Sequence, residues 1–436
     1  MTTLAKSNQE PTALTREGRR RLVSIACAGI TFQGGSAAVD SSTIMAALVY
    51  QLTGSSVAVG AVTAVLRFGW LFPQLIVGFL AQKRASSMRY YAIGGFGRAA
   101  CLALLSAVLF TGSEVSAFML SVVVLLLWTA YSFVSGIVAV PYNDIVARSV
   151  SSGRRSRLLA TRFFGGGLLA LGIAVIANGL VGNLPFPVSY AAIIAAASGL
   201  MFVSSIVFVS MGEPEAEVPT ETPMAFFEYL REGITVFRTD NRFRLFVYAQ
   251  WFGGAVLMAL PFYVVQATAI GFDLRQVALL LGAQTAGSLA SNALWGWWGD
   301  RRGKGSLLQA VALGRVIPPV VILILVSVRD MSAVGLLICF MGTFFILGAL
   351  ANGLTIAVIG YLMEISPEEK RPAYSGYFNA LTAPAFLFPL VGGVLAAAAG
   401  LAAVFALSLV AACLQFFLVR RLRKSPGIGD AASPSA

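Results

Sequence analysis

Gly296-Trp-Trp-Gly-Asp300-Arg-Arg-Gly-Lys304-Gly-Ser-Leu307 is a short cationic turn that joins two long apolar runs. A degraded copy, Gly78-Phe-Leu-Ala-Gln82-Lys-Arg-Ala-Ser-Ser-Met-Arg89, lies about half of the chain length earlier. A cationic turn between apolar runs that recurs at the half-length indicates two structurally related halves.

The composition of the 436-residue chain predicts that lipid surrounds it. Apolar residues make up 58% of the sequence, charged residues only 11%, and the mean hydropathy is +0.82. A soluble protein of 45.9 kDa could not bury that much apolar surface, which argues against a soluble enzyme. The polar residues 1–21 precede a long apolar run without a small-residue cleavage site, so we expect an uncleaved first span.

The residue types that most often carry chemistry are scarce. The sequence has no histidine, which removes the commonest general base, metal ligand and near-neutral proton carrier. Its four cysteines lie far apart inside apolar runs, so we expect buried thiols and neither a disulfide framework nor a metal site. There is no phosphate-binding loop of the Walker type either. We therefore expect no enzymatic activity and no cofactor.

Twelve apolar runs are long enough to cross about 30 Å of hydrocarbon. They cover 22–50, 57–81, 90–111, 115–140, 159–182, 188–211, 244–269, 275–298, 307–328, 332–362, 374–398 and 401–419. The sequence thus predicts an all-α membrane protein with an N-terminal tail (1–21), a six-helix bundle (22–211), a polar linker (212–243), a second six-helix bundle (244–419) and a C-terminal tail (420–436). Within the linker, Phe226–Phe237 mixes apolar and charged residues and is expected to form a surface helix.

The basic residues predict the orientation of these spans. Of the 31 Lys and Arg, 26 fall on the side that holds both termini, two on the opposite side, and three inside spans. Because positive charge accumulates in cytoplasmic loops, we expect both termini in the cytoplasm. An odd number of spans would destroy this asymmetry, which favours twelve.

The pattern G-x-x-x-D-R-x-G-K/R in the quoted turn resembles the signature loop of major facilitator superfamily transporters. The resemblance extends to the whole chain in topology, and it implies two pseudo-symmetric six-helix bundles around a central cavity. It also implies a set of residues that close the cytoplasmic side.

These expected gate residues come from both halves. Gly296, Asp300, Arg301, Gly303 and Lys304 occupy the signature loop, and Glu364 with Arg371 resembles the family's E-x6-R element. In the family the loop aspartate is understood to interact with the start of the eleventh helix and with nearby arginines.

The first half supplies Asp144 and Gln82 to the expected gate. Gln82 stands where the acid is expected. Because glutamine carries no charge, we expect this side of the gate to be weaker, with Asp300 as the main electrostatic latch.

Asp40 is the one carboxylate deep inside an apolar span. It lies about 27 Å along the first helix, and Arg67 lies about 22 Å along the second, at 1.5 Å per residue. Opposite charges at similar depth on consecutive antiparallel helices invite a pair. The two residues either bind a substrate or coupling ion, or form a structural salt bridge.

Polar side chains recur at helical spacing on three spans. Gln33, Ser36, Asp40 and Thr43 form one stripe on the first, Gln284, Ser288 and Asn292 another on the eighth, and Trp128, Tyr131 and Ser135 a mixed face on the fourth. Such stripes either bond neighbouring helices or line a wet cavity, and their concentration favours the cavity.

Arg98 and Arg315 lie at equivalent positions of the third and ninth spans, for which we expect a structural role.

The sequence predicts a secondary active transporter that works by alternating access. Coupling to protons through Asp40 is a hypothesis, and facilitated diffusion without coupling stays open because only one deep carboxylate is available. A non-transporting receptor or assembly factor with the same fold is the alternative from another class. Arg67 would suit an anion, Asp40 a cation, and the aromatic lining an amphipathic molecule, so the substrate class stays open.

Residues Gln33–Met45 also resemble facilitator-family proteins of bacterial magnetosome membranes. That resemblance implies an iron transporter of an organelle membrane, but a chain without histidine offers few ligands for such a metal. We expect a bacterial inner membrane or one derived from it, a monomer, and no nucleic-acid partner.

Overall fold

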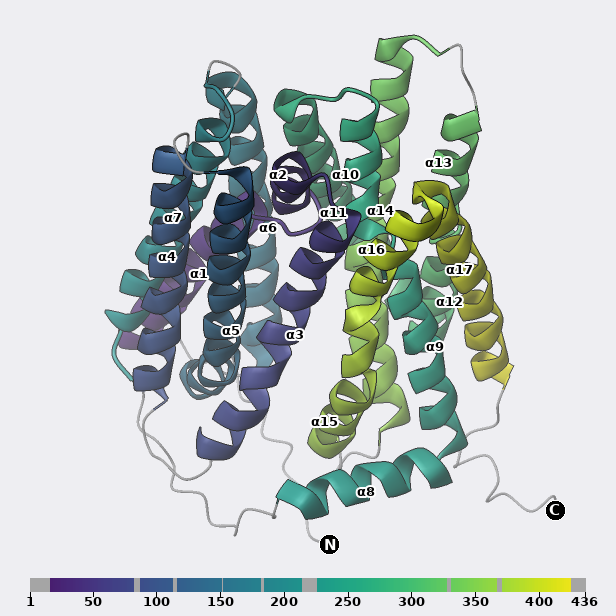
Figure 1. The fold of residues 1–436 in the computed structure, drawn as a ribbon. Coiled ribbons are helices and arrows are strands. Elements are labelled where there is room, and N and C mark those ends of the chain that lie inside the picture. The colour runs from purple at the N-terminus through teal and green to yellow at the C-terminus, as the bar shows by residue number, and fades with distance from the viewer. Residues whose placement is uncertain are drawn as a thin grey trace, which may run out of the picture.

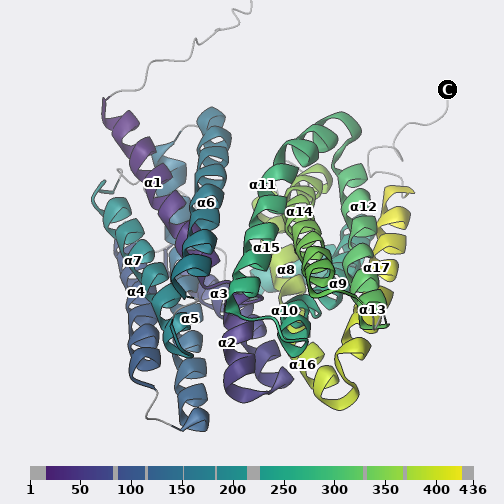
Figure 2. The same cartoon turned by 90° about the horizontal axis from the view of Figure 1, so that it is seen from above.

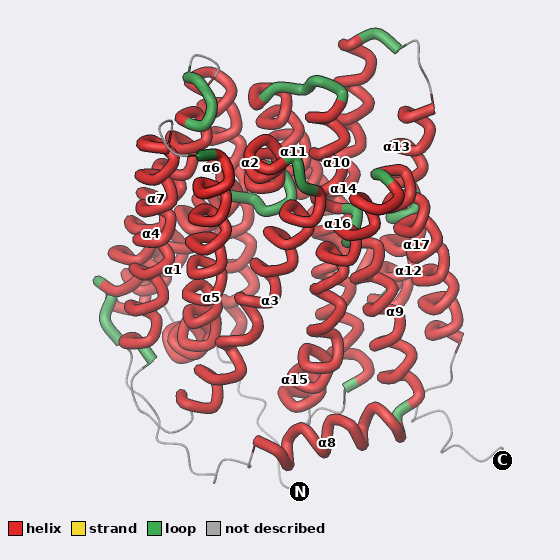
Figure 3. The backbone as a smooth tube through the Cα atoms, in the orientation of Figure 1, coloured by secondary structure: helices red, strands yellow, loops and turns green. Residues whose placement is uncertain are grey.

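The computed structural model describes residues 16–81, 87–112, 116–150, 152–181, 184–213, 226–327, 331–366 and 371–424. Within them all regular secondary structure is helical, and most of the helices run roughly parallel to one another (Figure 3). Many large apolar side chains on the outside are exposed, among them Phe118, Leu126, Val175 and Val334. An apolar exterior of this kind is what a bundle surrounded by lipid requires.

The first half contains α1 (Arg16–Ala38), α2 (Ile44–Thr53), α3 (Ser56–Ala81), α4 (Met88–Thr111), α5 (Ala117–Ser149), α6 (Ser152–Val181) and α7 (Val188–Val209). The second half contains α9 (Asn241–Leu257), α10 (Leu260–Ala269), α11 (Leu274–Arg302), α12 (Lys304–Gly314), α13 (Ile317–Ser327), α14 (Ala333–Ile365), α15 (Arg371–Thr382), the 3-10 helix η3 (Ala383–Leu387), α16 (Phe388–Ala399) and α17 (Leu401–Lys424). The two halves stand side by side (Figures 1 and 2).

Twelve predicted spans map onto these helices in order. Ten helical stretches are long and apolar enough to cross a membrane in the part of the chain that is described. The other two predicted spans correspond to α1 with α2, and to α6. The all-helical fold with two six-span halves is confirmed, but four spans are interrupted where the sequence predicted continuous helices.

The first span is interrupted at Asp40 because its side chain competes with the helix for backbone groups. Oδ1 of Asp40 accepts a hydrogen bond from the backbone N–H of Ser42 at 3.0 Å, which closes a local turn before α2. The seventh span is interrupted after Leu257, and Pro261 stands in the first turn of α10. The interruptions in the ninth and eleventh spans are likewise followed by prolines, which lack the N–H that a helix interior needs.

The same pairs of spans pack in both halves. In the first half α1 packs on α7, α3 on α5, and α4 on both α5 and α7. The equivalent pairs of the second half are α9 with α17, α11 with α14, and α12 with α14 and α17. This repeated packing, together with the interruption of the first span of each half, is what a duplicated six-helix unit predicts.

The amphipathic helix α8 (Phe226–Thr239) lies across one end of the bundle, which we call the α8 side (Figure 1). Residues Phe226–Phe237 were expected to form such a surface helix. Asp240 ends α8 and begins α9, because its Oδ1 accepts from the backbone N–H of Phe243 at 3.0 Å.

The two halves touch most closely through α3 and α16. At Gly60 there is no room for a Cβ atom, because the carbonyl oxygen of Pro389 occupies that space, and a Cβ atom at Gly393 would likewise overlap the carbonyl oxygen of Ser56. Gly60 lies near the start of α3, and Pro389 lies in the first turn of α16. Direct backbone contact at these glycines joins the two halves.

Candidate binding cavity

A cavity of about 660 Å³ lies inside the first half. Residues from α1, α3, α4, α5, α6 and α7 line it, and Ile359 of α14 contributes from the second half. The lining runs from Asp40, at the interruption of the first span, to Gln74 and Asn143 toward the α8 side. A second cavity of about 300 Å³ lies between the halves and shares Asp40, Ser41 and Arg67 with the first.

Asp40 is held by its own turn. Besides the backbone bond to Ser42, its Oδ1 accepts from the hydroxyls of Ser42 at 2.6 Å and of Thr43 at 2.9 Å. Asp40 is the only carboxylate among the described residues that line either cavity. Irregular backbone at membrane depth is tolerated where it lines a cavity, and this turn does so.

Arg67 of α3 lines the same two cavities as Asp40, as the sequence predicts. No ion pair joins them at the 4.0 Å that defines one, so the structural salt bridge is absent from this conformation. The guanidinium of Arg67 lies 5.6 Å from the ring centre of Phe386 in η3, a residue of the other half.

Two further arginines line the larger cavity. Arg98 of α4 is 3% exposed, and its guanidinium lies 4.4 Å from the ring centre of Phe32. Arg162 of α6 lies over the same ring at 5.6 Å and donates a hydrogen bond to the hydroxyl of Tyr142 at 2.9 Å. We assigned Arg162 to a cytoplasmic loop from the sequence, but α6 begins ten residues earlier and carries it into the bundle.

The polar stripes divide between the cavities and helix packing. Gln33 and Ser36 line the larger cavity with Asp40, and Gln284 lines the smaller one. Asn292 instead accepts a hydrogen bond from Nδ2 of Asn352 at 2.6 Å, which joins α11 to α14. A polar stripe in the sequence thus contains both residues that line a cavity and residues that bond to a neighbouring helix.

The aromatic face of α5 divides in the same way. Tyr131 and Ser135 line the larger cavity. Trp128 is 1% exposed and donates from its indole N–H to the carbonyl of Val62 at 2.9 Å, so it supports α3 and lines neither cavity.

The signature loop forms a tight turn between α11 and α12. Gly303 has φ +80°, a conformation that favours glycine. Asp300 is exposed and pairs with Lys304 at 3.0 Å, while the backbone N–H of Lys304 donates to Glu364 of α14 at 3.3 Å. The guanidinium of Arg301 lies 5.5 Å from the ring centre of Trp297.

The expected contact of Asp300 with the eleventh helix stays a prediction for a conformation closed on the α8 side. Gln82 and the side chain of Arg371 lie outside the described residues. Gly296 lies in the last turns of α11 and has open space around its Cα.

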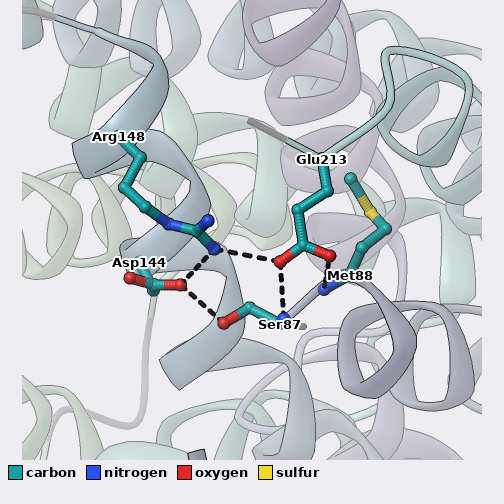
Figure 4. Close-up of polar contacts among 5 residues, drawn as sticks. All are labelled: Ser87, Met88, Asp144, Arg148 and Glu213. Carbon is teal, nitrogen blue, oxygen red and sulfur yellow. Dashed lines mark hydrogen bonds and ion pairs between the residues drawn. The ribbon is translucent and has the colours of Figure 1, made fainter. Parts of the chain in front are cut away.

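Asp144 belongs to a polar cluster on the α8 side of the first half (Figure 4). It accepts from the hydroxyl of Ser87 at 2.5 Å and pairs with Arg148, which also pairs with Glu213 at 3.0 Å. The Glu213 carboxylate accepts from the backbone N–H groups of Ser87 and Met88, so it caps α4 (Figure 4). Burial alone would lower the pKa of Arg148, but its bonds to the two carboxylates outweigh this effect and raise the pKa.

Comparison with known proteins supports this architecture. Residues 262–435 match the family model of the Major Facilitator Superfamily. The nucleoside transporter NupG superposes with a TM-score of 0.67 at 13% identity, over 94% of this chain and 100% of that one. An auto-inhibited POT family peptide transporter superposes with a TM-score of 0.67 at 11% identity, over 97% of this chain and 99% of that one.

The chain has the major facilitator fold. The match to the family model lies in the second half, which holds the Asp300 loop, and the structural match spans both halves of this facilitator-fold protein. No curated protein sequence matches the chain. None of these findings supports the magnetosome resemblance.

Proposed function

We propose that this chain is a secondary transporter that moves a small solute by alternating access. The observation that carries the proposal is the position of the two cavities. They meet at Asp40 and Arg67 where the halves face each other, and close glycine contacts join α3 to α16 across the two halves. A cavity near the middle of the bundle, between two duplicated halves, is the geometry that alternating access requires.

The comparisons support the same function. The two solved structures compared above are described as a nucleoside transporter and a peptide transporter. Their structural similarity carries the fold to this chain, and their low sequence identity carries nothing finer. A transport role agrees with that fold.

Neither alternative gains support from the site. An iron transporter would present several hard or borderline ligands, yet the described residues hold no group of three or more His, Cys, Asp or Glu side chains suited to a metal. A receptor without transport activity would not need a cavity that spans the contact between two duplicated halves.

Flux and conformation together test the proposal. Purified protein in proteoliposomes would be offered labelled nucleosides, amino acids, organic acids and quaternary amines, with and without a proton gradient. In parallel, distances between spin labels would be measured for two pairs. Met119 and Val334 lie at the starts of α5 and α14, on the side opposite α8, and Arg89 and Arg301 lie on the α8 side.

We expect uptake of one class above empty liposomes, and the two label pairs to change in opposite directions when that solute binds. Folded protein that shows no flux for any class and one fixed set of distances would disprove transport. Such a result would favour the receptor alternative.

A further inference from the structure

The larger cavity carries an excess of positive charge that no side chain neutralises. Arg67, Arg98 and Arg162 line it, against the single carboxylate of Asp40. Oδ1 of that carboxylate already accepts three hydrogen bonds within its own turn. In the described part of the chain, none of the three guanidinium groups has an ion pair.

Arg98 is the least compensated of these cations. It is buried, and its Nε has no hydrogen-bond partner within the described residues. Its titratable neighbours are Tyr91 and Tyr131, which are uncharged at neutral pH, and Arg162, which is a second cation. Both guanidinium groups lie over the ring of Phe32, at 4.4 Å and 5.6 Å from its centre.

Arg315, which lines the smaller cavity, shows how the donors of a buried arginine of this chain are satisfied by neighbouring groups. It occupies the position of the second half equivalent to Arg98, and it is also buried. However, it donates to Oε1 of Gln415 at 2.8 Å and to the carbonyl of Gly253 at 3.0 Å. For Arg98 the recorded polar partner is the hydroxyl of Tyr91, and Nε has none within the described residues, although the sequence predicted the same structural role for both arginines.

Buried cations without partners are costly, and a bound anion would remove that cost. A guanidinium group is planar and presents its donors in a fork that matches a carboxylate or a phosphate group. The remaining walls include the rings of Trp70, Tyr131 and Tyr142, which would pack against an apolar or aromatic body.

We propose that the substrate is an organic anion whose carboxylate or phosphate group is held by Arg98 and Arg162, with its apolar body against the aromatic walls. The inference rests on the proposed transport function only in calling the bound anion a substrate. The assignment of the cavity as an anion site is tested by binding alone.

The test measures ligand binding by the full-length protein in detergent, through thermal stabilisation and calorimetry. The probes are benzoate and phenyl phosphate, matched by neutral benzamide and cationic benzylammonium. Arg98→Gln removes the charge, Arg98→Lys retains it without the fork, and Arg275→Gln alters an exposed arginine outside the cavity.

We expect at least one of the two anions to bind and both other probes to fail. Arg98→Gln should weaken anion binding by about tenfold or more, the loss expected for a charge-assisted hydrogen bond. Arg98→Lys should recover part of the lost anion affinity, and the Arg275→Gln protein should bind anions like the wild type. Arg162→Gln provides a second, independent variant if Arg98→Gln does not fold.

Three outcomes would overturn the proposal: neither anion binds, benzylammonium or benzamide binds as well as the anions, or removal of the charge at Arg98 and at Arg162 leaves anion affinity unchanged. Anion binding without any flux would overturn transport and leave the anion site intact. Flux of a cation through a protein that binds no anion would overturn the anion site and leave transport intact.

Discussion

At the residue scale, Asp40 combines two tasks that are usually separate. Its Oδ1 fixes the turn between α1 and α2, and its carboxylate lines both cavities. An amide oxygen could accept the same three hydrogen bonds, but an amide cannot carry a proton. The replacement Asp40→Asn therefore separates the structural task from proton coupling.

We expect Asp40→Asn to fold and to keep exchange of substrate between two equal pools, because the turn is preserved. Uptake driven by a proton gradient should fall by about tenfold or more, the scale typical of losing a group that handles a proton. Both fluxes would be measured in proteoliposomes, with Glu17→Gln, an exposed substitution outside both cavities and the gate, as the control. Gradient-driven uptake equal to that of the wild type would remove Asp40 from the coupling mechanism.

Glu213 acts at the residue scale on stability. Its carboxylate caps α4 through the N–H groups of Ser87 and Met88 and pairs with Arg148 (Figure 4). Glu213→Gln should lower the free energy of unfolding by about 1–3 kcal/mol, because charge-assisted bonds are replaced by weaker ones at a partly buried site.

Thermal unfolding in detergent would measure that loss. The matched control is Glu17→Gln, which removes an exposed partner of Arg21 and should cost less than about 1 kcal/mol. Equal effects of the two substitutions would show that the Glu213 cluster adds no stability beyond that of a surface pair.

At the scale of elements, we expect the contact between α3 and α16 to control closure of the bundle on the side opposite α8. The backbone of Pro389 occupies the space that a side chain at Gly60 would need. Gly60→Leu should therefore hold this end apart and shift the population toward a conformation open there. Gly172→Leu is the control, since nothing lies within 4 Å of a Cβ atom at Gly172.

Spin labels at Met119 and Val334 would report the change, with a longer mean distance in Gly60→Leu than in the wild type or in Gly172→Leu. An unchanged distance in a folded Gly60→Leu protein would mean that this contact does not control closure.

At the scale of the whole molecule, charge placement predicts which side faces the cytoplasm. The excess of Lys and Arg lies in the segments that the sequence predicts to share one side with α8. In a bacterial host, a green fluorescent protein fused after residue 436 should fluoresce, and alkaline phosphatase fused there should be inactive. Alkaline phosphatase fused after Gly112 should be active, and the opposite pattern would reverse the orientation.

Much of the fold is predictable because lipid imposes simple rules on the sequence. Twelve apolar runs, a repeated cationic turn and a one-sided distribution of charge are properties of composition and spacing. The interruptions of the spans were missed, since a single Asp40 or Pro261 ends a helix only where the neighbouring helices accept the freed backbone groups.

The cavity is predictable only in part. Asp40, Arg67, Gln33 and Ser36 could be found because polar groups deep in an apolar span stand out. Trp128 and Asn292 follow the same pattern but bond to neighbouring helices. Arg162 was missed because it lies near a basic loop, although its place four residues into the predicted run 159–182 was a usable signal.

The sequence alone determined the helical membrane architecture, because crossing lipid depends on the length and polarity of each run. Only the tertiary structure decided which buried charges lack partners. Arg98 and Arg315 stand at equivalent positions, yet Arg315 donates to Gln415 and to the carbonyl of Gly253, whereas the Nε of Arg98 has no partner within the described residues. Whether a buried guanidinium is compensated depends on groups far away in the chain, which the fold alone brings to within a few ångströms.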